Sequence, residues 1–184
     1  MSLRILGIDP GSRITGYGLV EVVGSRSTWL AHGRIRCGEG PLGQRLLQIH
    51  TELSAVIREY RPQEAAVEAV FVRNNAASAI VLGQARGAAI CALAAAGLEL
   101  AEYAPAKIKS AIVGQGRAEK HQVQHMIKAL LGLAEAPPAD AADALAIALC
   151  HAHLRAAPGV RAGRGSRGRW TAEQVAALAR GVKP

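Results

Sequence analysis

The pattern of apolar and polar positions divides the chain into a strand-rich first part and a helical second part. Short apolar runs predict strands over 3–9, 15–23, 28–37, 64–70 and 98–103. Apolar positions that recur every three and four residues predict helices over 41–60, 76–96, 105–113, 118–131 and 139–154. This order predicts an α/β fold, with a mixed five-stranded sheet made of an antiparallel meander plus parallel strands and with helices on both faces.

Length and charge indicate a boundary near residue 155. The chain has 184 residues, enough for one domain with a core of its own. Of the formal net charge of +8, +6 lies from Arg155 onward, where there are seven Lys or Arg and one acid. We expect one folded domain over 1–155 and a basic, disordered tail over 156–184, whose charge would suit a polyanionic partner.

Cysteine usage and hydropathy indicate the compartment in which we expect the protein. Cys37, Cys91 and Cys150 are odd in number and form no Cys-x-x-Cys pair, which is typical of small buried side chains in a reducing compartment. No cationic and apolar leader opens the chain. The most apolar window, 79–98, contains Gln84 and Arg86, which argues against a membrane span. We therefore expect a cytoplasmic protein without membrane contact.

Two acids lie where the pattern predicts buried strands. Asp9 ends the first strand, directly before Pro-Gly, and Glu68 lies among apolar residues in AAVEAV. A buried carboxylate is unfavourable unless a positive group meets it. Taken alone, Asp9 is explained as a turn residue and Glu68 as the partner of an arginine such as Arg73.

Two further acids lie at the start of the last helix. Asp140 and Asp143 are three residues apart, so they share one helical face. Acids at a helix N-terminus are favourable, but one would suffice, and the next six residues are apolar almost all round. Carboxylates on rigid elements are the hard oxygen ligands that Mg²⁺ or Mn²⁺ prefers. Two such ions can hold the attacking and leaving oxygens of a phosphoryl displacement.

Five segments carry a family resemblance across residues 3–153. They are GIDPGSRITGYG, AVEAVF, LGQARGAAI, AEKHQVQHM and ADAADALAIALCHAH. In this order they resemble the RuvC family of bacterial Holliday-junction resolvases. The resemblance implies a ribonuclease H-like fold, a homodimer, and an endonuclease that places paired symmetric nicks in four-way DNA junctions. It also implies two Mg²⁺ ions per subunit in the active complex, or Mn²⁺ in their place, a RuvA–RuvB branch-migration complex as partner, and no nucleotide cofactor.

The resemblance also implies roles for individual residues. The metal ligands within the family motifs are Asp9, Glu68, Asp140 and Asp143. Lys109 and Lys120 would lie near the scissile phosphate, Lys120 as a catalytic residue, and Phe71 would reach into the DNA at the junction centre. Phosphate contacts are expected from Arg73, Arg86 and Arg117. Ala69 stands where the family often has Gln.

Two other classes stay open on the sequence alone. An acetate-kinase or actin-like phosphotransferase also carries Asp-x-Gly-Ser at a hairpin, but it needs a duplicated core, and this chain has no GxxxxGK loop. A non-catalytic, junction-binding architectural protein would use the tail and Phe71, without a need for two acids on one helix. Helix 76–96, with Gly83 and Gly87 one turn apart, is a candidate dimer seam, with burial against its own sheet as the alternative.

Overall fold

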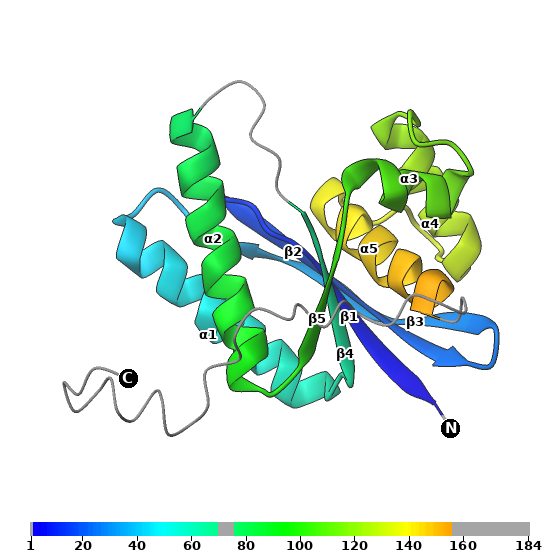
Figure 1. Ribbon diagram of the computed structural model, residues 1–184, viewed down its shortest axis with the longest axis horizontal. Coiled ribbons are helices and arrows are strands. Elements are labelled where there is room, and N and C mark those ends of the chain that lie inside the picture. The colour runs from blue at the N-terminus through cyan, green and yellow to red at the C-terminus, as the bar shows by residue number, and fades with distance from the viewer. Residues whose placement is uncertain (1, 70–75, 156–184) are drawn as a thin grey trace, which may run out of the picture.

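The computed structural model describes residues 2–69 and 76–155. Phe71, Arg73 and the expected tail over 156–184 lie outside the described residues. The described part is a five-stranded mixed sheet with helices on both faces (Figure 1). The predicted fold class is therefore confirmed.

The sheet combines a meander with two parallel strands. Its strands are β1 (Leu3–Asp9), β2 (Ile14–Val23), β3 (Arg26–Arg36), β4 (Glu64–Glu68) and β5 (Glu99–Tyr103). Their spatial order is β3-β2-β1-β4-β5, with the first three antiparallel and with β4 and β5 parallel to β1. Because β1 and β4 are parallel neighbours, their carboxyl ends meet at one edge of the sheet.

The helices of the described residues form two layers, one on each face of the sheet (Figure 1). The first layer holds α1 (Leu42–Tyr60) and α2 (Ala76–Ala95), and the second holds α3 (Pro105–Val113), α4 (Lys120–Leu131) and α5 (Ala139–Arg155). The core is accordingly split into two clusters, one on each side of the sheet. The α5 helix is buried almost all round, which agrees with its apolar sequence.

Element boundaries differ from the predicted ones where side chains compete with the backbone pattern. The α4 helix begins at Lys120 rather than at 118, because Glu119 and Gln122 form a capping box. In that box the Glu119 N–H donates to Gln122 Oε1 at 2.8 Å. The β4 strand ends at Glu68 instead of running to 70. Glu68 is thus the last residue of its strand, as Asp9 is of β1.

The α5 helix lies unusually close to β1 and β2 because glycines face it. A Cβ atom on Gly7 would lie 2.6 Å from the backbone nitrogen of Ala148, and one on Gly18 would lie 2.7 Å from Leu145 Cγ. A Cβ on Gly16 would meet the backbone of Asp140. Any larger residue would push the helix away. The glycines therefore allow the start of α5 to lie beside the end of β1.

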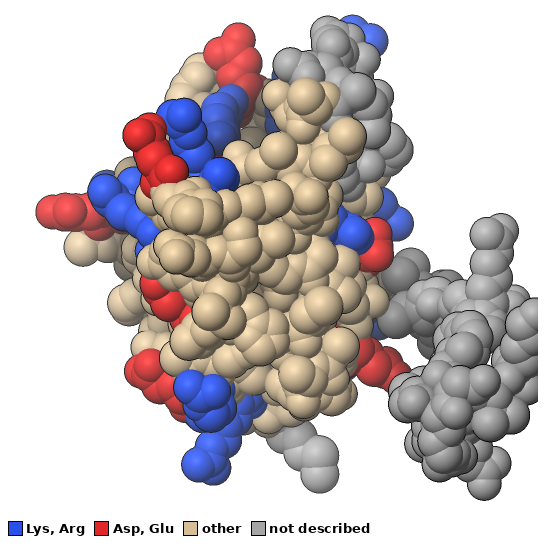
Figure 2. Space-filling view, turned by 90° about the vertical axis from the view of Figure 1, so that its left-hand side faces the viewer, with Lys and Arg blue, Asp and Glu red and all other residues tan. Residues whose placement is uncertain are grey.

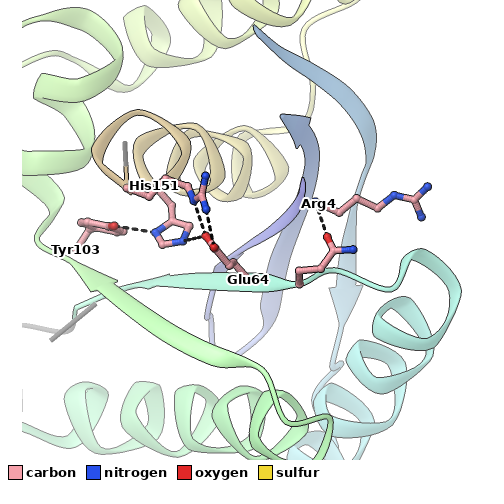
Figure 3. A network of polar contacts seen from close by, with 6 residues as sticks. Arg4, Glu64, Tyr103 and His151 are labelled. Atoms are coloured by element: carbon pink, nitrogen blue, oxygen red, sulfur yellow. Dashed lines mark hydrogen bonds and ion pairs between the residues drawn. The ribbon is translucent and has the colours of Figure 1, made fainter. Parts of the chain in front are cut away.

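A partly buried polar network ties the far end of α5 to β4 and β5 (Figure 3). His151 Nε2 lies 2.8 Å from Glu64 Oε2, and Arg155 makes two hydrogen bonds to the same carboxylate, at 2.8 and 2.9 Å. A carboxylate only accepts, so Nε2 carries the proton, and the Tyr103 hydroxyl donates to Nδ1 at 2.7 Å. Burial acts to raise the pKa of Glu64, but Arg155 and His151 outweigh it and the pKa is lowered. The carboxylate therefore stays charged and holds the helix in place.

We expect Gly7→Ala to destabilise the protein by about 3 kcal/mol or more, because its Cβ would clash with helix backbone that cannot rotate away. Gly43→Ala is the matched control, since Gly43 is helical with nothing within 4 Å of the added carbon. The control should be neutral or stabilising by up to about 1 kcal/mol. Urea unfolding measures both, and equal effects would contradict the close approach of α5.

Candidate active site

The four predicted acids come together at one edge of the sheet. Asp9 ends β1 and Glu68 ends the neighbouring β4, where Ile8 pairs with Val67. Asp140 and Asp143 lie in the first turns of α5, whose start packs on Gly16, the cross-strand partner of Asp9. All three other carboxylates act electrostatically on Asp9. Segments separated by more than 130 residues of sequence thus contribute to one acidic site.

The site is electrostatically strained around Asp9. Burial is the largest effect that raises the pKa of Asp9, and the charges of Asp143, Glu68 and Asp140 add to it. Together they move the pKa from 3.8 to about 7, although Lys120 opposes them. Burial and then Asp143 also raise the pKa of Glu68. Ionised carboxylates are therefore unfavourable here unless more positive charge is supplied.

Both predicted lysines lie beside these carboxylates. Lys120 Nζ is 2.8 Å from Asp143 Oδ2, and this hydrogen bond is the main cause of the raised pKa of Lys120. Lys109 Nζ donates to the carbonyl of Ala118 at 2.8 Å, and its charge lowers the pKa of Glu68. The lysines come from α3 and from the first residue of α4, so the helical layer brings cations to the acidic edge.

The predicted arginines have different environments. Arg86 of α2 forms an ion pair with Glu102 of β5 at 2.6 Å, and its side chain is only 20% exposed. Its charge is therefore already offset within the fold. Arg117 is exposed in the turn before α4. DNA contacts by these two residues stay predictions, and Phe71 and Arg73 lie outside the described residues.

Two residues that the sequence did not single out hold the turn after Asp9. Thr15 is fully buried, and its hydroxyl accepts from the Gly11 N–H at 3.3 Å and donates to the Gly11 carbonyl at 3.1 Å. The Arg45 guanidinium, from α1, donates to the carbonyl of Ser12. Only the buried threonine at the start of a strand offered a local signal. Arg45 meets the turn through the tertiary fold alone.

The donor set fits a hard divalent cation. As the side chains are placed, no three Asp, Glu, His or Cys residues within 2–69 and 76–155 are close enough to hold one ion. Asp143 is engaged by Lys120, and the like charges act to separate the remaining carboxylates. The donors are nevertheless all carboxylate oxygens, the ligand type of Mg²⁺ and Mn²⁺, and a cation would offset the charge that raises the pKa of Asp9.

The fold and the site define a ribonuclease H-like protein with an acidic centre where two parallel strands end. A family model described as "Crossover junction endodeoxyribonuclease RuvC" matches residues 5–151. The chain belongs to this family. It is therefore an endodeoxyribonuclease, and family membership implies dependence on a divalent metal ion. The phosphotransferase and architectural alternatives are not supported.

Relatives and solved structures agree with this assignment. A RuvC crossover junction endodeoxyribonuclease of Marinobacter nauticus is 57% identical over 150 residues, which are 82% of this chain and 86% of the relative. One of Shewanella piezotolerans is 55% identical over 169 residues, or 90% and 98% of the two chains. The structure described as "T. thermophilus RuvC in complex with Holliday junction substrate" is 36% identical, with a TM-score of 0.78, over 83% of this chain and 94% of that one. The yeast mitochondrial Holliday junction resolvase, at 13% identity and a TM-score of 0.60, shares the fold.

We expect Asp9→Asn to stabilise the metal-free protein at high pH. The pKa of Asp9 is about 7 in the folded protein but 3.8 as an ordinary aspartate in the unfolded chain. The free energy of unfolding therefore falls as the pH rises from about 4 to about 7. The amide does not ionise, so its advantage should be near zero around pH 4 and reach on the order of 2–4 kcal/mol above pH 7. Urea unfolding in chelator at several pH values measures this.

The control for this comparison is Glu39→Gln, which changes an 86%-exposed acid outside the site. Its effect should stay within about 0.5 kcal/mol at every pH. A gain for Asp9→Asn that is the same at pH 4.5 and at pH 8 would contradict the raised pKa of Asp9.

Proposed function

We propose that this protein resolves four-way DNA junctions in homologous recombination and repair, by paired symmetric nicks. The observation that carries the proposal is the convergence of Asp9, Glu68, Asp140 and Asp143 on one edge of a ribonuclease H-like sheet. The solved relative with a Holliday junction substrate supports the choice of DNA structure.

We propose Asp9, Glu68, Asp140 and Asp143 as the metal ligands, with Mg²⁺, or Mn²⁺ in its place, and two ions per subunit. When bound, such ions would supply the chemistry of the reaction, by lowering the pKa of the attacking water and stabilising the leaving oxygen. Asp9 carries the charge that the other three acids act on, so it is the carboxylate most relieved by added cations.

The lysines have complementary tasks in this proposal. Lys120 holds Asp143 at 2.8 Å and its side chain is 66% exposed, so a turn of either side chain frees both groups. The carboxylate then becomes available as a ligand and the ammonium as a phosphate contact. Lys109 stays anchored to the Ala118 carbonyl, which fixes its charge near Glu68. Both ammonium groups would offset charge that develops on the phosphate.

We further propose a homodimer through the face formed by α1 and α2. The centre of this face is largely free of charged side chains (Figure 2). Ile80 is 62% exposed there, and an added Cβ on Gly83 or Gly87 would meet nothing within 4 Å. No backbone of the described part approaches these glycines, so they are free to admit a second copy. A four-way junction offers two equivalent strands, and a two-fold dimer would supply one site for each.

The same apolar surface explains a second property of α2. Among the described residues one helix, Ala77–Ala95, is long and apolar enough by composition to cross a membrane, with 22% of that window buried. Its inner side nevertheless packs Ala85, Ala89 and Leu93 into the core, and Arg86 is paired with Glu102. Pairing with a second copy would cover the outer side without a membrane.

The remaining assignments follow from the proposed activity. We place the protein in the cytoplasm, where the DNA is, and propose the RuvA–RuvB branch-migration complex as its partner. We assign the nuclease domain to residues 1–155, since the family match ends at 151. The basic charge over 156–184 would add sequence-independent attraction to DNA.

Asp9→Asn should reduce nicking of a synthetic mobile junction in Mg²⁺ to background, while it binds the junction as tightly as the wild type or more tightly, because one negative charge is removed. Nicking is read on denaturing gels and binding by fluorescence anisotropy, with linear duplex as substrate control and Glu39→Gln as variant control. Binding by the wild type without Mg²⁺-dependent nicking would refute the nuclease and favour an architectural protein.

Ile80→Glu should shift the protein from dimer to monomer, because it places a charge on the uncharged α1–α2 face. Leu130→Glu is the matched control, a helical leucine that is 46% exposed on α4, in the other layer. Sedimentation velocity measures the oligomeric state. A dimer that survives Ile80→Glu but not Leu130→Glu would move the interface to the other layer.

A further inference from the structure

One row of residues crosses the sheet at the acidic edge. Asp9 of β1 pairs with Gly16 of β2, and Gly16 pairs with Arg34 of β3. Adjacent strands are about 4.8 Å apart, so the Cα atoms of Asp9 and Arg34 are separated by about 10 Å. Arg34 thus lies in the same row across the sheet as Asp9, on β3, the outermost strand.

The side chain of Arg34 projects toward the α5 side of the sheet. The Gly16 face covered by α5 meets the backbone of Asp140, and directly paired residues of antiparallel strands project from the same face. The next residue, Ile35, is buried in the cluster formed with α1, so its neighbours must point the other way. Arg34 and Arg36 therefore both lie on the α5 side, beside the start of that helix.

These two arginines carry charge that the described fold does not use. Both are exposed, and within 2–69 and 76–155 neither has an ion-pair partner within 4 Å. Lys109 acts on Glu68, on the β4 side of Asp9, whereas Arg34 stands on the β3 side. Positive charge therefore flanks the acidic site on both sides.

We propose that Arg34, with Arg36 beside it, binds backbone phosphates of the cleaved strand on the β3 side of the scissile bond. The inference rests on the proposed nuclease function and extends its DNA path to the edge strand. A span of about 10 Å covers only a few nucleotides of a DNA strand, so the contact lies within about three nucleotides of the cut. The guanidinium fork suits a phosphate, and such a contact is independent of base sequence.

The test measures junction binding without cleavage, in an Asp9→Asn background with Mg²⁺. Adding Arg34→Ala should weaken binding roughly 5- to 20-fold. It should also reduce the slope of log K against log salt concentration by about one, the value for one lost phosphate contact. Adding Arg36→Ala should reduce this slope again. Arg34→Lys, which keeps the charge, should fall between Arg34→Ala and the background. Arg26→Ala is the matched control, an exposed arginine on the same strand about 25 Å away, and it should change neither quantity.

Neutral methylphosphonate linkages locate the contact. These linkages are introduced one at a time, at positions up to four nucleotides from the cut. One of them should weaken junction binding by the Asp9→Asn protein. The same linkage should have no effect on binding by the protein that also carries Arg34→Ala. Unfolding curves verify that each variant is folded, and Arg34→Gln replaces Arg34→Ala if it is not. An unchanged affinity and salt slope for Arg34 variants, or an equal loss for Arg26→Ala, would overturn the inference. Wild-type nicking is measured in parallel, so failure there counts against the nuclease and not against Arg34.

Discussion

The repulsion among carboxylates at the end of a buried strand is the constraint on which this structure depends. Asp9 lies where burial and three neighbouring acids all oppose its ionisation, and its pKa of about 7 expresses that opposition. Left alone, the acids would separate or stay protonated. The fold keeps them together, so part of the stability of the domain maintains an arrangement that becomes favourable when cations arrive. The acidic site therefore lowers the stability of the metal-free domain and in return provides ligands for cations.

The α5 helix is the element on which this repulsion acts most directly. Its first turns carry two of the acids, and repulsion from Asp9 acts to push them off the sheet. Two features oppose this push. Glycines on β1 and β2 let the helix pack in contact with strand backbone, and at the other end the carboxylate of Glu64 ties His151 and Arg155 to β4. A helix held at its far end and along its length keeps its N-terminus at a fixed distance from β1.

The charges of the molecule are distributed by face. The α1–α2 side is largely uncharged at its centre, which suits contact with another apolar surface (Figure 2). The acidic edge has Lys109 and Lys120 among the carboxylates, and Arg34 on the edge strand beyond. A polyanion can approach a negative centre only if cations lie around it, so these positive side chains offset the repulsion that the acids exert on DNA.

The sequence by itself determined the elements and the chemical character of the site. Periodicity identifies all ten elements of the described residues to within a few positions, and acids in apolar surroundings stand out because burial without a partner is unfavourable. The tertiary structure alone decided the pairings. Lys120 with Asp143, Arg86 with Glu102 and Arg45 with the turn at Ser12 depend on strand register and on how helices pack, since residues distant in sequence carry no local signal of one another. For the same reason the place of Arg34 in line with Asp9 appeared only once the strands were paired.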